Sequence, residues 1–156
     1  MAMTKNKLVL ILDNIRSREN VGSIFRTADA AGVSIIYLCG ITPVPPHPKI
    51  EKASLGAEKT VPYKYIRDAW RLVTNLQEEG YEVVALEQTK ESEDLFKFKG
   101  KYPLTLVVGN EVQGVSEAVL KRVNKKISIR MYGKKESLNV SVATGIALYS
   151  LASWKR

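Results

Sequence analysis

The chain has 156 residues, enough for one domain that buries most of its apolar surface and too few for two ordinary domains. Hydrophobic residues make up 45% and charged residues 26%, a composition typical of a soluble globular protein rather than a disordered one. The net charge of +8, from 24 Lys and Arg against 16 Asp and Glu, favours a polyanionic partner such as nucleic acid, although a merely basic protein has the same balance.

Cysteine and histidine are scarce, and no membrane or export signal is evident. One cysteine, Cys39, rules out a disulfide within the chain, and its position after an apolar run predicts a buried thiol at a strand end. Cys39 and the single histidine, His47, are too few for a typical zinc cluster. No segment approaches the roughly 20 apolar residues that span a bilayer, and the first seven residues carry no signal-peptide core. We therefore expect a cytoplasmic protein with no metal site and no membrane contact.

The first elements are predicted from a continuous apolar run and from a helical pattern. Residues 8–12 are all apolar, which is typical of a strand covered on both faces. A helix is then expected to begin near Ser17 or Asn20, both of which are good N-cap residues, and to end at Gly32. Its apolar positions follow the i, i+3, i+4, i+7 spacing of one buried face: Val21, Ile24, Phe25 and Ala28.

The middle of the chain alternates strands, loops and helices. A second strand is expected over residues 34–38, and the proline-rich residues 43–48 must form a loop because proline fixes the backbone and removes a donor. A short helical turn follows at residues 50–55. The next helix ends at Gly80, and its apolar stripe consists of Ile66, Ala69, Trp70, Val73 and Leu76.

The second half continues this alternation. Residues 81–86, 104–108 and 127–129 are predicted strands, and residues 117–123 and 139–153 are predicted helices. Strands that alternate with amphipathic helices argue for one α/β domain with a mostly parallel sheet flanked by helices. No repeat, low-complexity tract or linker divides the chain.

Several common chemistries are excluded by the residues at the strand ends. A dinucleotide-binding site needs G-x-G-x-x-G after the first strand, but no glycine occurs there before Gly22. Residues 109–116 approach the phosphate loop G-x-x-x-x-G-K-S, but Val115 replaces the phosphate-binding lysine and Glu111 would face anionic phosphates. His47 lacks a strand–Ser–helix elbow of the G-x-S-x-G type, so a hydrolytic triad is not expected.

Three separated segments carry the functional signal, and each stands where a strand ends or a helix begins. The first is Asn20-Val-Gly-Ser-Ile-Phe-Arg-Thr-Ala28, the second is Leu106-Val-Val-Gly-Asn-Glu-Val-Gln-Gly114, and the third is Ile127-Ser-Ile-Arg-Met131 followed by Ser137-Leu-Asn-Val-Ser141. Together they resemble the three motifs of the SpoU (TrmH) family of RNA ribose 2'-O-methyltransferases. The resemblance covers nearly the whole chain and implies one catalytic domain over residues 1–156, without a separate RNA-binding extension.

The resemblance also implies features that no residue pattern predicts. The family fold is a sheet with a deep trefoil knot at its C-terminal end, and threaded chains are too rare to be inferred from periodicity. The family also implies a homodimer, with the pocket at the subunit interface and the first-motif residues meeting the cofactor site of the partner chain. We therefore expect a knotted homodimer.

The catalytic residues are expected in all three motifs. The first motif of the family has an asparagine and an arginine six residues apart, as Asn20 and Arg26 are here. Taken alone, Arg26 would be a solvated side chain and Asn20 a helix cap. By resemblance Arg26 is catalytic, and Glu111, Ser137 and Asn139 orient the ribose and the arginine. Because arginine stays protonated in essentially every protein site, we interpret Arg26 as an electrostatic stabiliser of the alkoxide rather than as a general base.

The second and third motifs imply a site for S-adenosylmethionine, with no metal. Glycines at the end of a buried strand let a ligand approach the backbone, and ligands bind outside the carboxyl ends of strands in open α/β sheets. The chain departs from the family at Val112, where a glycine is frequent, and at Arg130, where a proline is usual. The residues expected at the cofactor are Leu86, Gly109, Asn110, Glu111, Gly114, Ile129, Met131, Ser137 and Leu138.

Basic side chains are the expected RNA contacts, although some of them are ordinary solvated lysines. Arg130, Lys134 and Lys135 make one loop basic, which suits RNA phosphate. The motifs match tRNA enzymes and ribosomal RNA enzymes alike, so either RNA is an expected substrate. The candidate contacts are Lys49, Lys52, Lys59, Lys64 and the cluster from Lys121 to Lys135.

Two other functions stay open. A non-catalytic RNA-binding protein could keep this fold, but such a protein is expected to lack Arg26 or the Ser137-x-Asn139 pair, and both are present. A methyltransferase of a related knotted family would modify a base, whereas the pair formed by Asn20 and Arg26 argues for ribose.

Overall fold

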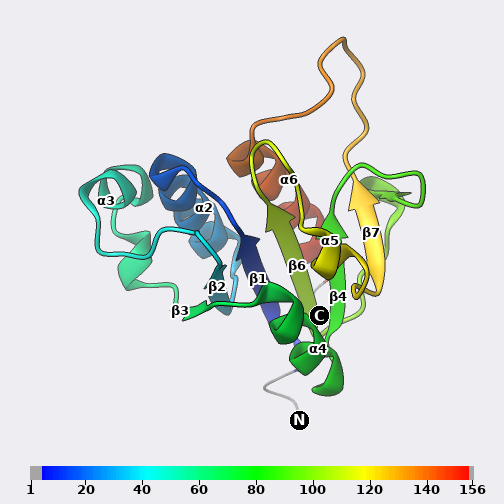
Figure 1. Ribbon diagram of the computed structural model, residues 1–156, viewed down its shortest axis with the longest axis horizontal. Helices are drawn as coiled ribbons and strands as arrows, with labels where there is room; N and C mark the ends of the chain where they lie inside the picture. Colours follow the sequence, from blue (N-terminus) through cyan, green and yellow to red (C-terminus); the bar gives the residue numbers. More distant parts are fainter. Residues whose placement is uncertain (1–4, 155–156) are drawn as a thin grey trace.

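The computed structural model describes residues 5–154, which form one seven-stranded sheet with helices on both faces (Figure 1). The strand order is β3-β2-β1-β6-β4-β7-β5, and every strand pairing is parallel. The predicted α/β class with a mostly parallel sheet is confirmed. The strands are β1 (Leu8–Asp13), β2 (Ile35–Cys39), β3 (Tyr63–Ile66), β4 (Glu82–Leu86), β5 (Glu93–Asp94), β6 (Leu104–Gly109) and β7 (Lys125–Ser128).

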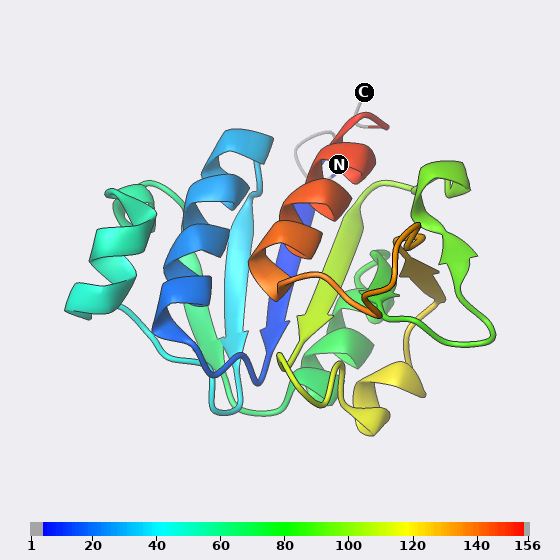
Figure 2. The same ribbon diagram turned by 90° about the horizontal axis from the view of Figure 1, so that it is seen from above.

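The helices divide between the two faces of the sheet, as Figure 2 shows from above. Helices α2 (Arg18–Ala31) and α6 (Val140–Ala152) cover one face, and α3 (Pro48–Ser54) packs beside α2. Helices α4 (Ala69–Glu78) and α5 (Glu117–Leu120) cover the other face. Two short 3-10 helices, η1 (Ala57–Lys59) and η2 (Leu95–Lys97), complete the elements.

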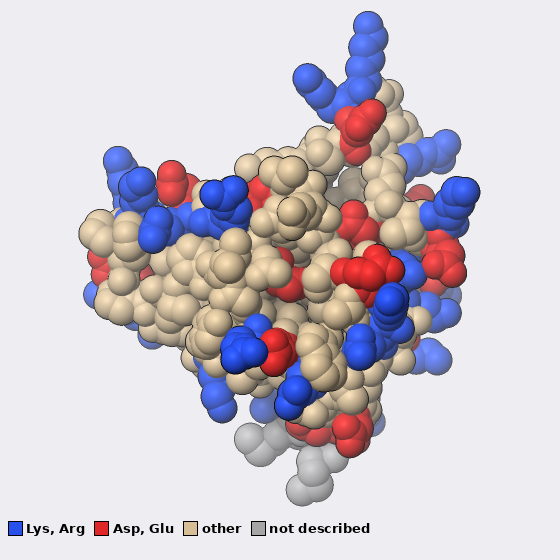
Figure 3. All heavy atoms as spheres, in the orientation of Figure 1, with Lys and Arg blue, Asp and Glu red and all other residues tan. Residues whose placement is uncertain are grey.

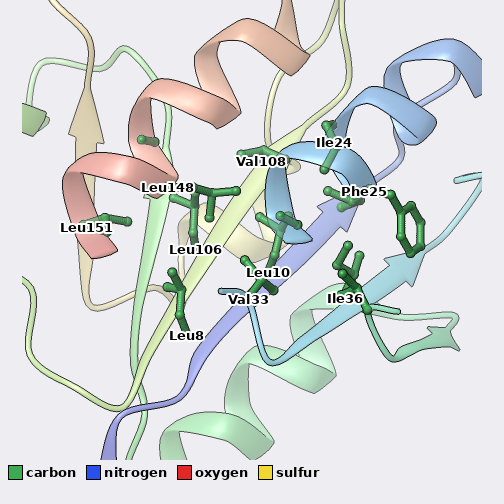
Figure 4. Packing of buried hydrophobic residues seen from close by; sticks show 14 of the residues in the cluster. Leu8, Leu10, Ile24, Phe25, Val33, Ile36, Leu106, Val108, Leu148 and Leu151 are labelled. Atoms are coloured by element: carbon green, nitrogen blue, oxygen red, sulfur yellow. The ribbon is translucent and has the colours of Figure 1, made fainter. Parts of the chain in front are cut away.

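The core lies on both sides of the central strands β1 and β6, whose residues are all buried. Side chains alternate along a strand, so Leu10 and its register partner Leu106 pack under α2 and α6 with Phe25 and Leu148 (Figure 4). Intervening residues such as Ile11 pack under α4 and α5. This double coverage explains why both strands are continuous apolar runs.

Helix α2 begins and ends where its sequence predicts. The Ser17 hydroxyl accepts a hydrogen bond from the Asn20 amide at 3.1 Å, and Gly32 ends the helix with a φ of 79°. Of the two expected caps, Ser17 therefore fills the position. The side chain of Asn20 is left for other contacts.

Two edge strands were not predicted from the sequence. The residues of β3 are largely exposed, because the strand lies at the edge of the sheet, so they show no apolar alternation. Ile66 was expected on the helical stripe, which is wrong: it is the last residue of β3 and pairs with Cys39. The other missed strand, β5, has only two residues and pairs with β7 at the opposite edge.

Other boundaries differ by a few residues. Helix α5 ends at Leu120 rather than at residue 123, and β7 ends at Ser128, so Ile129 follows the strand. Cys39 is fully buried, as predicted. Within residues 5–154, no helix is both long and apolar enough to cross a membrane. The trefoil knot remains a prediction for this chain.

Candidate active site at the carboxyl edge of the sheet

A cavity of about 460 Å³ opens beyond the carboxyl ends of β4, β6 and β7 and the start of α6. This is the edge at which open α/β sheets bind ligands. Its walls come from residues 86–88 and 108–114 and from part of the stretch 128–143, so it joins the second and third segments. All of the residues expected at the cofactor line it: Leu86, Gly109, Asn110, Glu111, Gly114, Ile129, Met131, Ser137 and Leu138.

One wall of the cavity is a tight loop after β6, and Asn110 organises it. The backbone N–H and C=O of Asn110 pair with Gly114 at 3.0 and 2.9 Å. Its side-chain oxygen accepts from the amides of Val112 and Gln113 at 2.8 and 2.9 Å, and its Nδ2 donates to the carbonyl of Asn14 at 2.8 Å. The side chain that was expected to bind cofactor therefore also fixes the loop and ties it to the end of β1.

The glycines of this loop are required by close approach. A Cβ on Gly109 would collide with the backbone of Gly114 and Val115. Gly114 has a φ of +75°, and a Cβ there would collide with the carboxylate of Glu87. The left-handed residue is thus Gly114, whereas Val112, where the family often has glycine, is 87% exposed to solvent.

Glu87 is a cavity residue that sequence reasoning missed. It follows Leu86 at the carboxyl end of β4, and its Oε1 accepts a hydrogen bond from the amide of Val115 at 2.8 Å. It connects two walls of the cavity, the segment after β4 and the loop after β6. Its position next to Leu86 was the available signal, because residues at strand ends face this edge. The other lining residues not singled out are Gln88, Val108, Val112, Gln113, Ser128, Glu136, Val140 and Ala143.

Asn20 joins all three segments through hydrogen bonds. Its Nδ2 donates to Oε2 of Glu111 at 3.1 Å, and its Oδ1 accepts from Nδ2 of Asn139 at 3.3 Å. Asn139 also caps α6, because its Oδ1 accepts from the amides of Ser141 and Val142 at 2.9 and 3.2 Å. One amide side chain thereby links the starts of α2 and α6 to the loop after β6.

Glu111 is held as an anion at the start of α2. Its two oxygens accept from the amides of Arg16 and Ser17 at 3.0 and 2.9 Å, in addition to the bond from Asn20. Partial burial alone would raise the pKa of the Glu111 carboxyl, but these three hydrogen bonds to the charged form outweigh it and lower the pKa below its usual value. The N-terminal end of a helix also favours a negative charge.

Arg26 stands apart from this constellation. It lies on the exposed face of α2, opposite the buried Ile24 and Phe25, as its position off the apolar stripe predicts. Neither Arg26 nor Asn20 lines the cavity. Within residues 5–154, Arg26 makes no hydrogen bond or ion pair with another side chain. The chain by itself therefore brings Glu111, Ser137 and Asn139 to the cavity but leaves Arg26 facing solvent.

The charge of the cavity is opposite to that of the protein. Its described lining includes the carboxylates of Glu87, Glu111 and Glu136 and no lysine, arginine or histidine. Carboxylates with apolar neighbours such as Leu86 and Leu138 suit an organic cation with a flat apolar part, and S-adenosylmethionine is such a molecule. Among residues 5–154, no group of three or more His, Cys, Asp or Glu side chains is placed to hold a metal ion.

Comparison with known proteins identifies the family. The model of the SpoU rRNA methylase family matches residues 7–149. The chain belongs to this family. This membership confirms the family inferred from the three segments.

This SpoU protein is similar to enzymes that act on different RNAs. It is 36% identical to the tRNA (guanosine(18)-2'-O)-methyltransferase of Aquifex aeolicus, across 91% of this chain and 67% of that protein. It is 34% identical to the 23S rRNA (guanosine-2'-O-)-methyltransferase RlmB of Ralstonia nicotianae, across 91% of this chain and 57% of that protein. The chain thus spans about three fifths of the length of such curated relatives.

A solved structure relates this fold to the cofactor. The SpoU methyltransferase AviRb of Streptomyces viridochromogenes, in complex with AdoMet, superposes with a TM-score of 0.86 at 26% identity. The match covers 96% of this chain and 60% of the AviRb chain. A protein of the same fold therefore binds S-adenosylmethionine.

Proposed function

We propose that this chain transfers the methyl group of S-adenosylmethionine to a ribose 2'-hydroxyl of tRNA or rRNA. The observation that carries the proposal is the cavity at the carboxyl edge of the sheet, where the second and third segments meet and where Asn20 attaches the first. Residues 1–156 act as one catalytic domain. The protein acts in the cytoplasm, where its tRNA or rRNA substrate is found.

The cavity residues hold the cofactor and orient it. When bound, S-adenosylmethionine supplies a methyl carbon that is electrophilic because it is attached to a sulfonium cation. Glu87 and Glu136 offer negative charge to that cation, and Leu86, Ile129 and Leu138 offer apolar contact to its adenine. The loop that Asn110 fixes presents backbone to the ligand without having to rearrange, which lowers the cost of binding.

Arg26 stabilises negative charge on the ribose 2'-oxygen as that oxygen attacks. Its permanently protonated guanidinium cannot accept the hydroxyl proton, which passes to an RNA phosphate or to water. Ser137 and Asn139 hydrogen-bond the ribose and align its hydroxyl with the methyl group. Glu111 and Asn20 keep Asn139 in position through their hydrogen bonds.

A homodimer completes the site. Helix α6 has no charged residue and carries apolar side chains on its exposed face as well as its buried one: Leu148 and Leu151 are buried, while Val142 and Tyr149 are 51% and 55% exposed. A helix that is apolar all round is normally covered on all sides, and a second copy of the chain would cover the outer face of α6. Such a dimer lets Arg26 of one subunit reach the cavity of the other, which accounts for its distance from its own cavity.

The basic surface supplies RNA contacts. Lys and Arg side chains gather over α3 and the start of α2, and again on the loop that projects beyond the cavity (Figure 3). Both groups lie toward the carboxyl edge of the sheet, so an RNA that spans them passes the cavity. Phosphate contacts of this kind give affinity without sequence preference.

The test uses isotope-labelled S-adenosylmethionine with separate tRNA and rRNA pools. We expect labelled 2'-O-methylnucleosides in one pool, and a decrease of about 10²–10³-fold for Arg26→Ala, because the developing charge then has no cation beside it. Arg71→Ala, which removes an arginine from α4 on the other face of the sheet, outside both basic groups and the cavity lining, is the control and should remain active. Label on a base instead would contradict transfer to the ribose 2'-hydroxyl, and cofactor binding without transfer to either pool would favour the non-catalytic RNA-binding alternative.

A further inference from the structure

The loop between β7 and α6 projects from the molecule beside the cavity, as the orange segment of Figure 1 shows. We name residues 130–136 the arm. No helix or strand forms within it. Its base is part of the cavity, because Met131, Glu136 and the following Ser137 are lining residues. Whatever binds the arm therefore lies next to the place where methyl transfer is proposed.

The arm carries an aromatic ring in an unusual position. Tyr132 is 86% exposed, close to the highest exposure of any large apolar side chain described. The guanidinium of Arg130 lies 5.6 Å from the centre of its ring. A single exposed aromatic residue is ordinary on a protein surface, but a ring paired with a guanidinium beside a nucleic-acid enzyme's cavity is a surface on which a base can stack.

The charges of the arm are free to meet phosphate. Lys134 and Lys135 are exposed and, like Arg130, form no ion pair within residues 5–154. The only carboxylate of the arm, Glu136, sits at the cavity rim. The space-filling view shows basic side chains at the tip of this projection (Figure 3). The arm thus combines three cations with one stacking surface.

We infer that the arm binds an unpaired stretch of RNA, in which Tyr132 stacks on a base next to the methylated nucleotide and the cations contact the flanking phosphates. Stacking on an exposed ring requires a base that has left its own stack, which a loop or bulge offers and a continuous duplex does not. The substrate nucleotide then lies in an RNA loop. This inference rests on the proposed function and narrows its substrate class.

The test compares two synthetic RNAs, a stem closed by a seven-nucleotide loop and a fully paired duplex of equal length. We expect Tyr132→Ala to weaken binding of the hairpin by about 5- to 150-fold, as the loss of one base–aromatic stack does, and to leave binding of the duplex within about twofold. Tyr132→Phe should restore hairpin binding, because the ring is retained. Phe96→Ala removes an aromatic side chain of 61% exposure outside the cavity and is the matched control.

The cations are tested by salt dependence. The double variant Lys134→Gln, Lys135→Gln should weaken binding of both RNAs. It should also reduce the slope of log affinity against log salt by about 1.5, because each of the two lost phosphate contacts contributes about 0.7–0.9 to that slope. Tyr132→Ala should leave that slope unchanged. A Tyr132→Ala variant that altered the salt slope as much as the lysine variant would show that the ring does not stack.

The alternative role for the arm is a lid over the cofactor. In that case Tyr132→Ala would weaken S-adenosylmethionine binding without RNA present, or would affect hairpin and duplex equally, and either result overturns the inference. Cofactor affinity that is unchanged in calorimetry supports it. The binding assay needs no turnover. A preference for the hairpin that depends on Tyr132, without any methyl transfer, would therefore contradict the proposed function but not the inference about the arm.

Discussion

Asn20 shows how one side chain can serve both the fold and the site. Because Ser17 caps α2, the amide of Asn20 is available to donate to Glu111 and to accept from Asn139. An amide has a donor and an acceptor at one end, so it can join two partners that could not bond each other in the same way. At the residue scale, the hydrogen bonds of this one side chain hold the three segments of the site together.

The charge of Glu111 gives a pH-dependent contribution to stability. Its pKa in the folded state is below its ordinary value, so the charged form stabilises the fold above that ordinary value and this contribution is lost as pH falls through the lowered pKa. We expect Glu111→Gln to lower the free energy of unfolding at neutral pH and the difference from wild type to shrink at acidic pH, where the carboxyl is protonated in both states. Urea unfolding at both pH values measures it. A difference that stays constant with pH would mean that the carboxylate's charge is not involved.

Glu87 should distinguish the cofactor from its demethylated product. S-adenosylmethionine carries a sulfonium charge that S-adenosylhomocysteine lacks, and Glu87 lines the cavity. We expect Glu87→Gln to weaken binding of S-adenosylmethionine by about three- to tenfold and binding of the product less, because only the former loses a charge–charge attraction. Calorimetry with both ligands measures the two affinities. Glu117→Gln, on α5 outside the cavity lining, is the control, and equal losses for both ligands would point to a role of Glu87 in loop structure alone.

At the scale of elements, helix α2 is an example of an element that its own sequence specifies well. Its caps are both local, and its buried face repeats at helical spacing, so the sequence predicts it closely. By contrast, β3 is an exposed edge strand, and its pairing with β2 depends on where the intervening α3 leads the chain. Sequence patterns predict an element from its buried face or its capping residues. An exposed edge strand such as β3 has neither, so its sequence does not predict it.

Gly22 tests the packing of α2 against α3. A Cβ at this position would lie 2.5 Å from the carbonyl oxygen of Ile50 and 2.7 Å from the Cβ of Ala53. Helix propensity alone favours alanine over glycine by about 0.5–1 kcal/mol, but the forced separation of the helices should make Gly22→Ala destabilising by about 1–3 kcal/mol. Thermal and urea unfolding measure it. Gly133→Ala, where the new methyl group meets open space, should change stability little, and a stabilised Gly22→Ala would show that the two helices can separate freely.

At the scale of the whole molecule, charge is divided by function. The protein carries +8, yet its cavity is lined by carboxylates and by no cation among the described residues. This division suits the proposed function, in which the outer surface attracts RNA and the cavity attracts a cationic cofactor.

The proposed dimer predicts complementation between two inactive variants. Arg26→Ala keeps an intact cavity, and Glu87→Lys keeps Arg26 but places a cation in the cavity. If each site combines the cavity of one subunit with Arg26 of the other, mixed dimers contain one complete site, and an equimolar exchanged mixture should recover about a quarter of the wild-type methyl transfer rate. Transfer assays before and after subunit exchange measure the recovery. No recovery, with mixed dimers demonstrated, would place Arg26 in the site of its own subunit.

The sequence by itself determined the alternation of strands and helices, the buried central strands, both ends of α2 and the family of the chain. Each of these features depends on residues that are close together in the chain: an apolar pattern, a capping residue or a short motif. Only the tertiary structure decided that Asn20 bonds side chains 91 and 119 positions away and that Glu87 faces the cavity. Such contacts depend on the strand order β1-β6-β4-β7, which brings the carboxyl ends of distant strands to one edge. Strand order is a property of the packed sheet and not of any local pattern.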